Sequence, residues 1–563
     1  MACLAGTAGF GAAPGNVPAQ SQRQATYCNP MDLPYRFQLS EASRREAGDP
    51  TLITFRGEYW LFPSKSGGYF HSPDLLHWSF VLATGYPVEN YAPTALVMNG
   101  KVYLTMSDTP KLFVTDNPLG GQWAEAADFG RIYGDPALFL DDDGRVYMCF
   151  GVSAKDVLRV TELDPKNGFK PLRTATVPES RSPATRGWQV PGDANELLQA
   201  ETWIEGSWMN KHAGKYYLQA AAPGTQYKSY ADGVLVSDNP MGPFTFAPYS
   251  PFSSKLTGFV AGAGHSSTLA GLDGRFWHVS TMTISMRHWF ERRLGLFPTW
   301  FTPDGEMITD TYLGDYPHYI GGNRGLTGWM LLSRHKPTTA SSTLAGHEPE
   351  KAVDEEIRTW WSAKSGDPGE WFQIDLGAVK TIEAVQINFA DEGSTVMGRS
   401  EDIYKYVFEI SSDGKSWATA VDHGTTGKDS PHDYEVLPRP MKARYVKLRN
   451  VHSPNSAKFS LFDLRVFGRG NGAPPAKVSA VNATRDASDP RRLTVNWQSV
   501  PNAEFYIVRM GTTPANLIQN YQVYDNATRA DIRSLNLGVK YYVAVDAVNE
   551  NGIARGAPAI PVP

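Results

Sequence analysis

The chain has 563 residues and a net charge of −5 without a long run of either sign, which excludes a nucleic-acid-binding protein and a protein held on an anionic membrane by charge. A chain of this length is too long to fold around one hydrophobic core and indicates roughly two to four domains. Aromatic residues make up 12% of the chain, and their rings suit β-sheet faces and stacking against sugar rings. The three cysteines, Cys3, Cys28 and Cys149, are too scattered for a disulfide framework or a zinc site.

The first segment, residues 1–24, opens with MACLAGTAGFGAAPGNVPAQ, a small, apolar and uncharged run. This composition is typical of the end of a secretory signal without its basic start, so we interpret the segment as a signal-peptide remnant or a disordered lead. A lipid on Cys3 is the alternative. We therefore expect an exported protein, whether periplasmic, cell-surface or extracellular. No other stretch of the sequence predicts a membrane span.

Five segments between residues 25 and 325 share one layout: a small or polar residue, a short strand, a glycine turn and a second strand with alternating aromatics. Repeats of about 43 to 70 residues, each with several period-2 strands, are typical of a β-propeller with four-stranded blades. We therefore predict a five-bladed propeller over residues 25–325. The leading residue precedes its turn glycine by eight or nine positions in the pairs Asp49–Gly57, Ala92–Gly100, Asp135–Gly144, Glu205–Gly214 and His265–Gly274.

The leading residues of the five repeats are expected to form a ring at the mouth of the propeller channel, which brings three carboxylates together. Hydrolysis of a glycosidic bond with inversion needs a carboxylic acid to protonate the leaving oxygen and a carboxylate to activate water, usually about 6.5 to 9.5 Å apart. We assign Glu205 as the general acid, because nearby carboxylates would raise its pKa. Asp49 is the predicted base, and Asp135 would tune Glu205 and hold the sugar. A single Asp-Pro more often only forms a turn, as in the third Gly-Asp-Pro of the chain at residues 366–368, which belongs to none of the five repeats.

The remaining ring residue, His265, has three open interpretations: a satisfied channel histidine, a substrate contact, or a ligand of a metal ion through waters. Aromatic residues in nearby loops are expected to form a sugar-stacking wall, although each alone is more often a packing residue. A long insertion at about 170–200 is expected to roof the site, which would favour a pocket and exo action. The candidate wall residues are Tyr91, Trp188, Trp203, Tyr227 and Phe259.

After the propeller the pattern changes to longer alternating strands. Residues 333–468 include EWFQIDLG, TIEAVQINFA and FSLFDLRVFG, and residues 476–563 include RLTVNWQSV, EFYIVRMG and KYYVAVDAVNENG. Both regions predict β-sandwiches. A linker at 469–475, rich in glycine and proline, separates them. The whole chain is therefore expected to be all-β.

The first 320 or so residues resemble glycoside hydrolase family 43, whose members are five-bladed propeller enzymes with inverting chemistry. The resemblance rests on Asp-Pro at Asp49 after YCNPMDLPY, Asp-Pro at Asp135, Glu-Gly at Glu205 and Gly-His-Ser at His265. It implies the roles of base, pKa modulator, acid and channel histidine, the last beside a calcium ion in some members, with no cofactor required. ERRLGLFPTWFTPDG resembles the family's late arginine segment, which selects Arg292 as a substrate-side residue.

Two departures from the family pattern suggest a divergent subgroup. Gly48 precedes Asp49 where the family commonly has proline, and Ser207 follows Gly206 where proline is also common. Neither departure removes an acid or a base.

Residues 335–468 resemble a discoidin-like (coagulation factor type C) domain of the jelly-roll kind, through KAVDEEIRTWWSA, WFQIDLG, FEISSDGKSW, ARYVKLR and LFDLRVFG. Such domains serve as carbohydrate-binding modules. Residues 476–563 resemble a fibronectin type III domain, through Trp497, Tyr506 and LNLGVKYYVAV, with Tyr541 as its tyrosine corner. That domain is usually a spacer.

Taken together, the patterns and the resemblance predict a monomeric, inverting and exo-acting glycoside hydrolase. Its expected substrate is an oligo- or polysaccharide of plant or microbial origin with terminal α-L-arabinofuranosyl or β-galactofuranosyl residues. The alternatives are a β-xylosidase or a β-galactosidase of the same family, and a carbohydrate-binding propeller without catalysis. The presence of acid, base and modulator together favours an enzyme over the binding protein.

Overall fold

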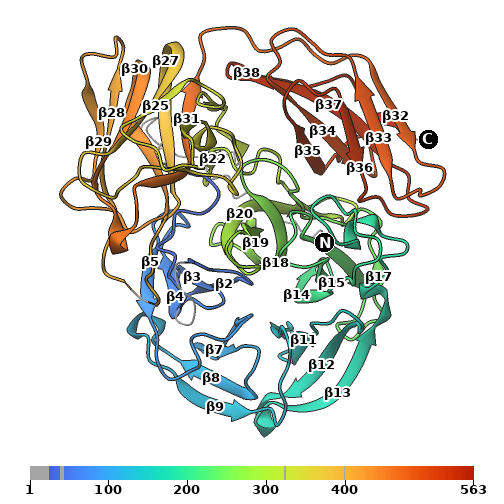
Figure 1. Ribbon diagram of the computed structural model, residues 1–563. Helices are drawn as coiled ribbons and strands as arrows, with labels where there is room; N and C mark the ends of the chain where they lie inside the picture. The colour runs from blue at the N-terminus through green and yellow to red at the C-terminus, as the bar shows by residue number, and fades with distance from the viewer. Residues whose placement is uncertain (1–24, 39–43, 323–324, 399, 563) are drawn as a thin grey trace, which may run out of the picture.

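A computed structural model describes residues 25–38, 44–322, 325–398 and 400–562 (Figure 1). The predictions for residues 1–24 and for Cys3 lie outside these ranges. Within them the protein is all-β, as expected, and no helix is long and apolar enough to cross a membrane. Cys28 and Cys149 are buried free thiols. The helices of the described ranges are single 3-10 turns: η1 (Pro118–Gly120), η2 (Pro165–Asn167), η3 (Pro178–Ser180), η4 (Gly187–Gln189), η5 (Pro349–Ala352) and η6 (Pro454–Ser456).

The first half of the described chain folds into five sheets of four antiparallel strands, each formed from consecutive strands. The first two sheets are β2 (Thr51–Phe55), β3 (Glu58–Phe62), β4 (Gly68–Ser72) and β5 (Ser79–Leu82), then β6 (Thr94–Met98), β7 (Lys101–Thr105), β8 (Lys111–Thr115) and β9 (Ala124–Asp128). The third is β10 (Ala137–Leu140), β11 (Val146–Phe150), β12 (Leu158–Asp164) and β13 (Lys170–Val177). The last two are β14 (Glu205–His212), β15 (Lys215–Ala222), β16 (Ala231–Ser237) and β17 (Thr245–Phe246), then β18 (Ala261–Ala270), β19 (Phe276–Thr283), β20 (Arg292–Phe301) and β21 (Met307–Thr309).

The five sheets form a closed ring around a common centre (Figure 1). The innermost strand of each sheet contacts that of the next, and β18 contacts β2 to close the circle. Hydroxyl groups join neighbouring sheets: Ser267 Oγ accepts from the backbone N–H of Leu52 at 2.9 Å, and Thr94 Oγ1 accepts from that of Leu138 at 2.9 Å. This arrangement is a β-propeller, and it places the starts of the innermost strands around one mouth.

A three-stranded sheet joins the start of the described chain to the end of the propeller. It pairs β1 (Thr26–Tyr27) with β22 (His318–Tyr319), and β22 with β23 (Gly325–Leu326).

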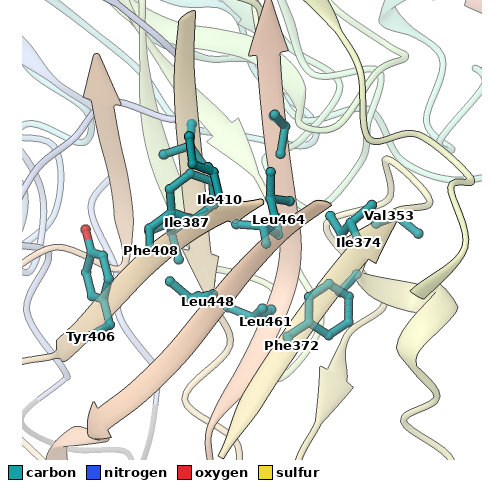
Figure 2. Close-up of a cluster of buried hydrophobic side chains, with 14 of the residues drawn as sticks. Val353, Phe372, Ile374, Ile387, Tyr406, Phe408, Ile410, Leu448, Leu461 and Leu464 are labelled. Carbon is teal, nitrogen blue, oxygen red and sulfur yellow. The ribbon is translucent and has the colours of Figure 1, made fainter. Parts of the chain in front are cut away.

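The second region is a β-sandwich built on one apolar core (Figure 2). Alternate residues of one of its long strands, such as Phe372 and Ile374, point into this core together with Phe408 and Leu448, as period-2 alternation predicts. Its strands are β24 (Met330–Leu331), β25 (Thr338–Ala340), β26 (Trp361–Ser362), β27 (Trp371–Phe389), β28 (Lys405–Ser411), β29 (Ala418–Asp422), β30 (His432–His452) and β31 (Ser460–Arg469).

The third region consists of two antiparallel sheets packed face to face. One holds β32 (Val481–Arg485), β33 (Leu493–Trp497) and β36 (Arg529–Ile532); the other holds β34 (Phe505–Gly511), β35 (Gln519–Val523), β37 (Tyr542–Asn549), β38 (Gly552–Ala554) and β39 (Ile560–Pro561). The hydroxyl of Tyr541 accepts from the backbone N–H of Asn536 at 3.0 Å. The two-sheet sandwich agrees with the expectation, and its fibronectin type III character stays a prediction.

Both sandwiches pack directly on the propeller. Arg465 of the second region is fully buried; it donates to both oxygens of Glu355 at 2.7 and 2.9 Å and to the carbonyl of Asp315 at the end of the propeller. In the third region, Leu535 accepts from the backbone N–H of Gly187 at 2.8 Å, and the backbone N–H of Leu537 donates back to the propeller insertion at 2.8 Å. Backbone hydrogen bonds therefore fix this domain on the propeller, and its role as a spacer stays a prediction.

Candidate active site

Four of the five predicted ring residues share a left-handed backbone conformation, either just before the innermost strand of their blade or within it. The residues with this positive φ are Asp49 (50°), Ala92 (48°), Asp135 (45°), Gly206 (59°) and His265 (44°). In the fourth repeat the position therefore belongs to Gly206, and the assignment of Glu205 to it was wrong by one residue. A register shift between Glu205 and Trp208 accommodates the difference and leaves Glu205 as the first residue of β14.

Each of the other four ring residues is held by a side chain from the preceding blade, which accepts a hydrogen bond from its backbone N–H. A buried polar partner at each position fixes the strained backbone, because an unpaired N–H there would cost stability. The pairs are Thr281 Oγ1 with Asp49 at 2.8 Å, Ser64 Oγ with Ala92 at 2.7 Å, Ser107 Oγ with Asp135 at 2.9 Å, and Asp232 Oδ1 with His265 at 3.0 Å.

Asp49 is buried and surrounded by donors. Its Oδ1 accepts from Arg292 Nη1 at 2.7 Å and lies 3.1 Å from His265 Nδ1, while its Oδ2 accepts from Ser64 Oγ at 2.6 Å. Burial alone would raise the pKa of Asp49, but the charge of Arg292, His265 and these hydrogen bonds together hold it below its usual value. Asp49 is therefore ionised near neutral pH, as a general base must be.

Glu205 has the opposite electrostatic character. Burial raises its pKa to about 7, and the negative charge of Asp49 adds to this, while Tyr230 and Arg292 oppose it. The Tyr230 hydroxyl donates to Glu205 Oε1 at 2.6 Å and orients the carboxyl group. A carboxyl group with a pKa near 7 keeps its proton at mildly acidic pH, which is the requirement for a general acid.

Asp135 interacts with the two other carboxyl groups. Its Oδ2 is 3.6 Å from His265 Nδ1, and its Oδ1 accepts weakly from Ser107 Oγ at 3.3 Å. Burial, then the charges of Glu205 and Asp49, raise the pKa of Asp135 well above its usual value. The structure thus brings the three predicted carboxyl groups into one cluster whose ionisations influence one another.

His265 belongs to the same cluster and is buried. Burial lowers its pKa, with the charge of Asp49 opposing the effect, and its Nδ1 faces Asp49. Calcium prefers six to eight oxygen ligands, and the acidic oxygens nearest to His265 are those of Asp49 and Asp135, which are already bound to donors. Within the described ranges the donor atoms close enough to hold an ion are those of His423, Asp433 and Glu435 in the second domain. The residues around His265 do not fit a directly ligated ion, and no step is derived through one.

The two adjacent arginines face different places. Arg292, the first residue of β20, binds Asp49 and donates through Nη2 to Glu46 Oε1 at 2.8 Å. Arg293 turns to the second domain, where its Nε donates to His432 Nε2 at 2.8 Å. Arg292 thus lies at the carboxylate cluster, and its contact with substrate stays a prediction. A Cβ on Gly48 would lie 2.4 Å from the Arg292 guanidinium, which explains why glycine precedes Asp49 in this chain.

The candidate aromatic wall is only partly at the site. Trp188 is 1% exposed inside the core of the third and fourth blades, and Phe259 is 1% exposed in a cluster at the second domain, so neither can stack on a sugar. Tyr91 lies beside the cluster, with its ring 5.8 Å from the Arg292 guanidinium. Trp203 is 41% exposed, and Tyr227 lines a cavity of about 520 Å³. These three remain candidates.

The predicted roof is shorter than expected. Residues 170–177 form the outer strand β13 of the third blade, so the insertion begins at η3. Its first half packs against the third domain, and its second half, which includes Glu196 and Leu197, lines the cavity beside Tyr227.

The residues that support the carboxylates were not predicted from the sequence; they are Tyr230, Ser64, Ser107 and Glu46. A usable pattern existed for the serines, because Ser64 follows Asp49 and Ser107 follows Ala92 by the same 15 positions. Tyr230 and Glu46 lie in loops without such a repeat, and only the folded chain brings them to Glu205 and Arg292.

Two regions of the chain match known families. Residues 43–307 match the model of the Glycosyl hydrolases family 43, and residues 337–463 match that of the F5/8 type C domain. The chain therefore carries a family 43 domain followed by a discoidin-like domain, as the resemblance implied.

Individual relatives match about a third of this chain. The chain is 27% identical over 258 residues to the beta-xylosidase of Xylanibacter ruminicola, covering 35% of this chain and 77% of that protein. It is 24% identical over 238 residues to the beta-D-galactofuranosidase xynD of Aspergillus niger, covering 36% and 63%. The match spans 40% to 77% of the length of these and another curated relative. The crystal structure of a thermostable family-43 glycoside hydrolase aligns with a TM-score of 0.40 and 22% identity, over 50% of this chain and 95% of that one.

Proposed function

We propose, from the premise that residues 43–307 are a family 43 glycoside hydrolase domain, that the protein is an inverting, exo-acting glycosidase. It would release terminal α-L-arabinofuranosyl or β-galactofuranosyl residues from plant or microbial polysaccharide. The proposal rests on one observation: the pKa values of two carboxyl groups in one cluster are shifted in opposite directions. The pKa of Asp49 is lowered, and that of Glu205 is raised to about 7.

The proposed reaction is a single displacement. Asp49 takes a proton from a water molecule, whose oxygen attacks the anomeric carbon, while Glu205 gives its proton to the departing glycosidic oxygen. Asp49 ends protonated and Glu205 ionised, and both exchange protons with solvent. Arg292, His265 and Ser64 occupy three of the four lone-pair directions of the Asp49 carboxylate, which leaves one for the water.

The choice of a furanosyl substrate has support from one of the relatives, which is named a beta-D-galactofuranosidase. Another relative is named a beta-xylosidase, and this makes a β-xylosidase the second candidate. A panel of 4-nitrophenyl arabinofuranosides, galactofuranosides, xylosides and galactopyranosides decides between them. We also expect export from the cytoplasm, a monomeric state and activity that survives chelation by EDTA.

The mechanism is tested with Glu205→Gln and Asp49→Asn. Each should lower kcat by about 10² to 10⁴-fold, the typical contribution of a positioned acid or base, with an unchanged circular dichroism spectrum. The matched control is Glu201→Gln, which changes an exposed carboxylate four residues away. NMR of the first-formed product should show the inverted anomer. Retained configuration, or full activity of either catalytic variant, would refute the assignment.

A further inference from the structure

A cavity of about 520 Å³ lies between loops of the propeller and the F5/8 type C domain. The propeller contributes the loops around Asp193, Tyr227 and Trp289, and the second domain contributes Arg358. The cavity is therefore shared between two domains that are far apart in the sequence.

Arg358 connects the three propeller loops that form this cavity. Its Nη1 donates to Asp193 Oδ2 at 2.6 Å, its Nε to the carbonyl of Ile284 at 2.7 Å, and its Nη2 to the carbonyl of Gln226 at 3.4 Å. The neighbouring Glu356 pairs with Lys228 at 2.5 Å. One segment of the second domain thus fixes the positions of loops that come from three separate parts of the propeller.

Two of the segments that line the cavity also approach the catalytic cluster through neighbouring residues. On one side, the carbonyl of Tyr227 accepts from the backbone N–H of Tyr230 at 3.1 Å, and the hydroxyl of Tyr230 holds Glu205. On the other side, Trp289 precedes Phe290, whose ring lies 5.1 Å from the guanidinium of Arg292. The two segments therefore link the cavity lining to the proposed acid and to the partner of the proposed base.

The chemistry of the lining fits an uncharged sugar. Trp289 is 64% exposed and Leu197 is 43% exposed, which gives apolar surface of the kind that stacks on a sugar ring. The charged groups are mostly paired, Asp193 with Arg358 and Arg287 with a glutamate at 3.6 Å. Glu196 adds a further carboxylate, which disfavours an acidic sugar.

We propose that this cavity binds the neutral sugar residue on the leaving-group side of the scissile bond, and that Arg358 of the F5/8 type C domain is a positioning residue for it. The inference rests on the proposed glycosidase function of the same site. The second domain is then part of the substrate site, in addition to any binding of carbohydrate on its own.

The test measures binding to the full-length Glu205→Gln protein by isothermal titration. The probes are α-1,5-arabinobiose, β-1,4-xylobiose and β-1,6-galactobiose, each beside its monosaccharide. We expect at least one disaccharide to bind about tenfold or more tightly than its monosaccharide. Adding Arg358→Met, or separately Trp289→Ala, should remove this difference and leave the monosaccharide affinity unchanged. Trp289 is exposed, so its variant remains informative if Arg358→Met fails to fold.

The controls are Arg444→Met, which breaks an ion pair elsewhere in the second domain, and Trp300→Ala, which removes another exposed tryptophan. Neither should change the disaccharide preference. The proposal is overturned if no disaccharide binds more tightly than its monosaccharide, or if Trp289→Ala leaves the preference intact. A protein that prefers disaccharides but hydrolyses no glycoside of the panel would instead refute the proposed catalytic function.

Discussion

The hydrogen bond from Tyr230 to Glu205 predicts a shift in the pH profile of the enzyme. The donor stabilises the ionised form of Glu205 and so lowers its pKa, although burial still holds that pKa at about 7. Tyr230→Phe removes the donor and should therefore raise the pKa further. A hydrogen bond to a charged group contributes about 1.5 to 3 kcal/mol, which corresponds to roughly 1 to 2 pKa units.

The assay is kcat/KM against pH, which reports the ionisations of the free enzyme. The unmodified enzyme should lose activity as pH rises through about 7, because the acid loses its proton. In Tyr230→Phe this alkaline limb should move to about pH 8 to 9, whereas the acid limb, set by Asp49, should stay in place. Tyr217→Phe is the matched control, since its hydroxyl donates to the carbonyl of Gly305 on the outer part of a blade. An alkaline limb that stays in place or moves down in Tyr230→Phe would refute Glu205 as the acid.

Two further predictions test the ring and the domain interface. Gly206→Ala places a Cβ at 2.6 Å from His265 and should lower kcat at least tenfold, whereas Gly57→Ala, also at positive φ but in open space, should cost about 1 kcal/mol of stability without loss of kcat. Arg465→Met leaves Glu355 buried without its partner and should lower the free energy of unfolding by about 3 to 5 kcal/mol. Denaturant unfolding measures this loss of stability. As the control, Arg444→Met changes a partly exposed ion pair and should lower the free energy of unfolding by at most about 1 kcal/mol. An equal loss of kcat in Gly206→Ala and Gly57→Ala would contradict the first explanation. An equal loss of stability in Arg465→Met and Arg444→Met would contradict the second.

Much of the site was predictable because the propeller repeats its local pattern. The spacing between a leading residue and its turn glycine located Asp49, Asp135 and His265, whose backbones indeed share the left-handed conformation. The same counting placed Glu205 one residue off, because Gly206 also precedes Gly214 by eight positions and a spacing of eight or nine allows either residue. The prediction of an aromatic wall was wrong for Trp188 and Phe259 for another reason. Both are aromatic residues that could stack on a sugar, but whether they are exposed depends on which segments cover them, and both are buried.

The sequence by itself determined the all-β class, the five repeats and the residue types that converge at the mouth, since period-2 alternation and turn glycines act over a few residues. Only the tertiary structure decided that Arg292 faces Asp49 while Arg293 faces the second domain. It also decided that Arg358 reaches loops more than 70 residues away in the chain. Such contacts join segments whose local sequences are independent of one another, so no local pattern contains them. They arise only when packing selects one arrangement of the domains.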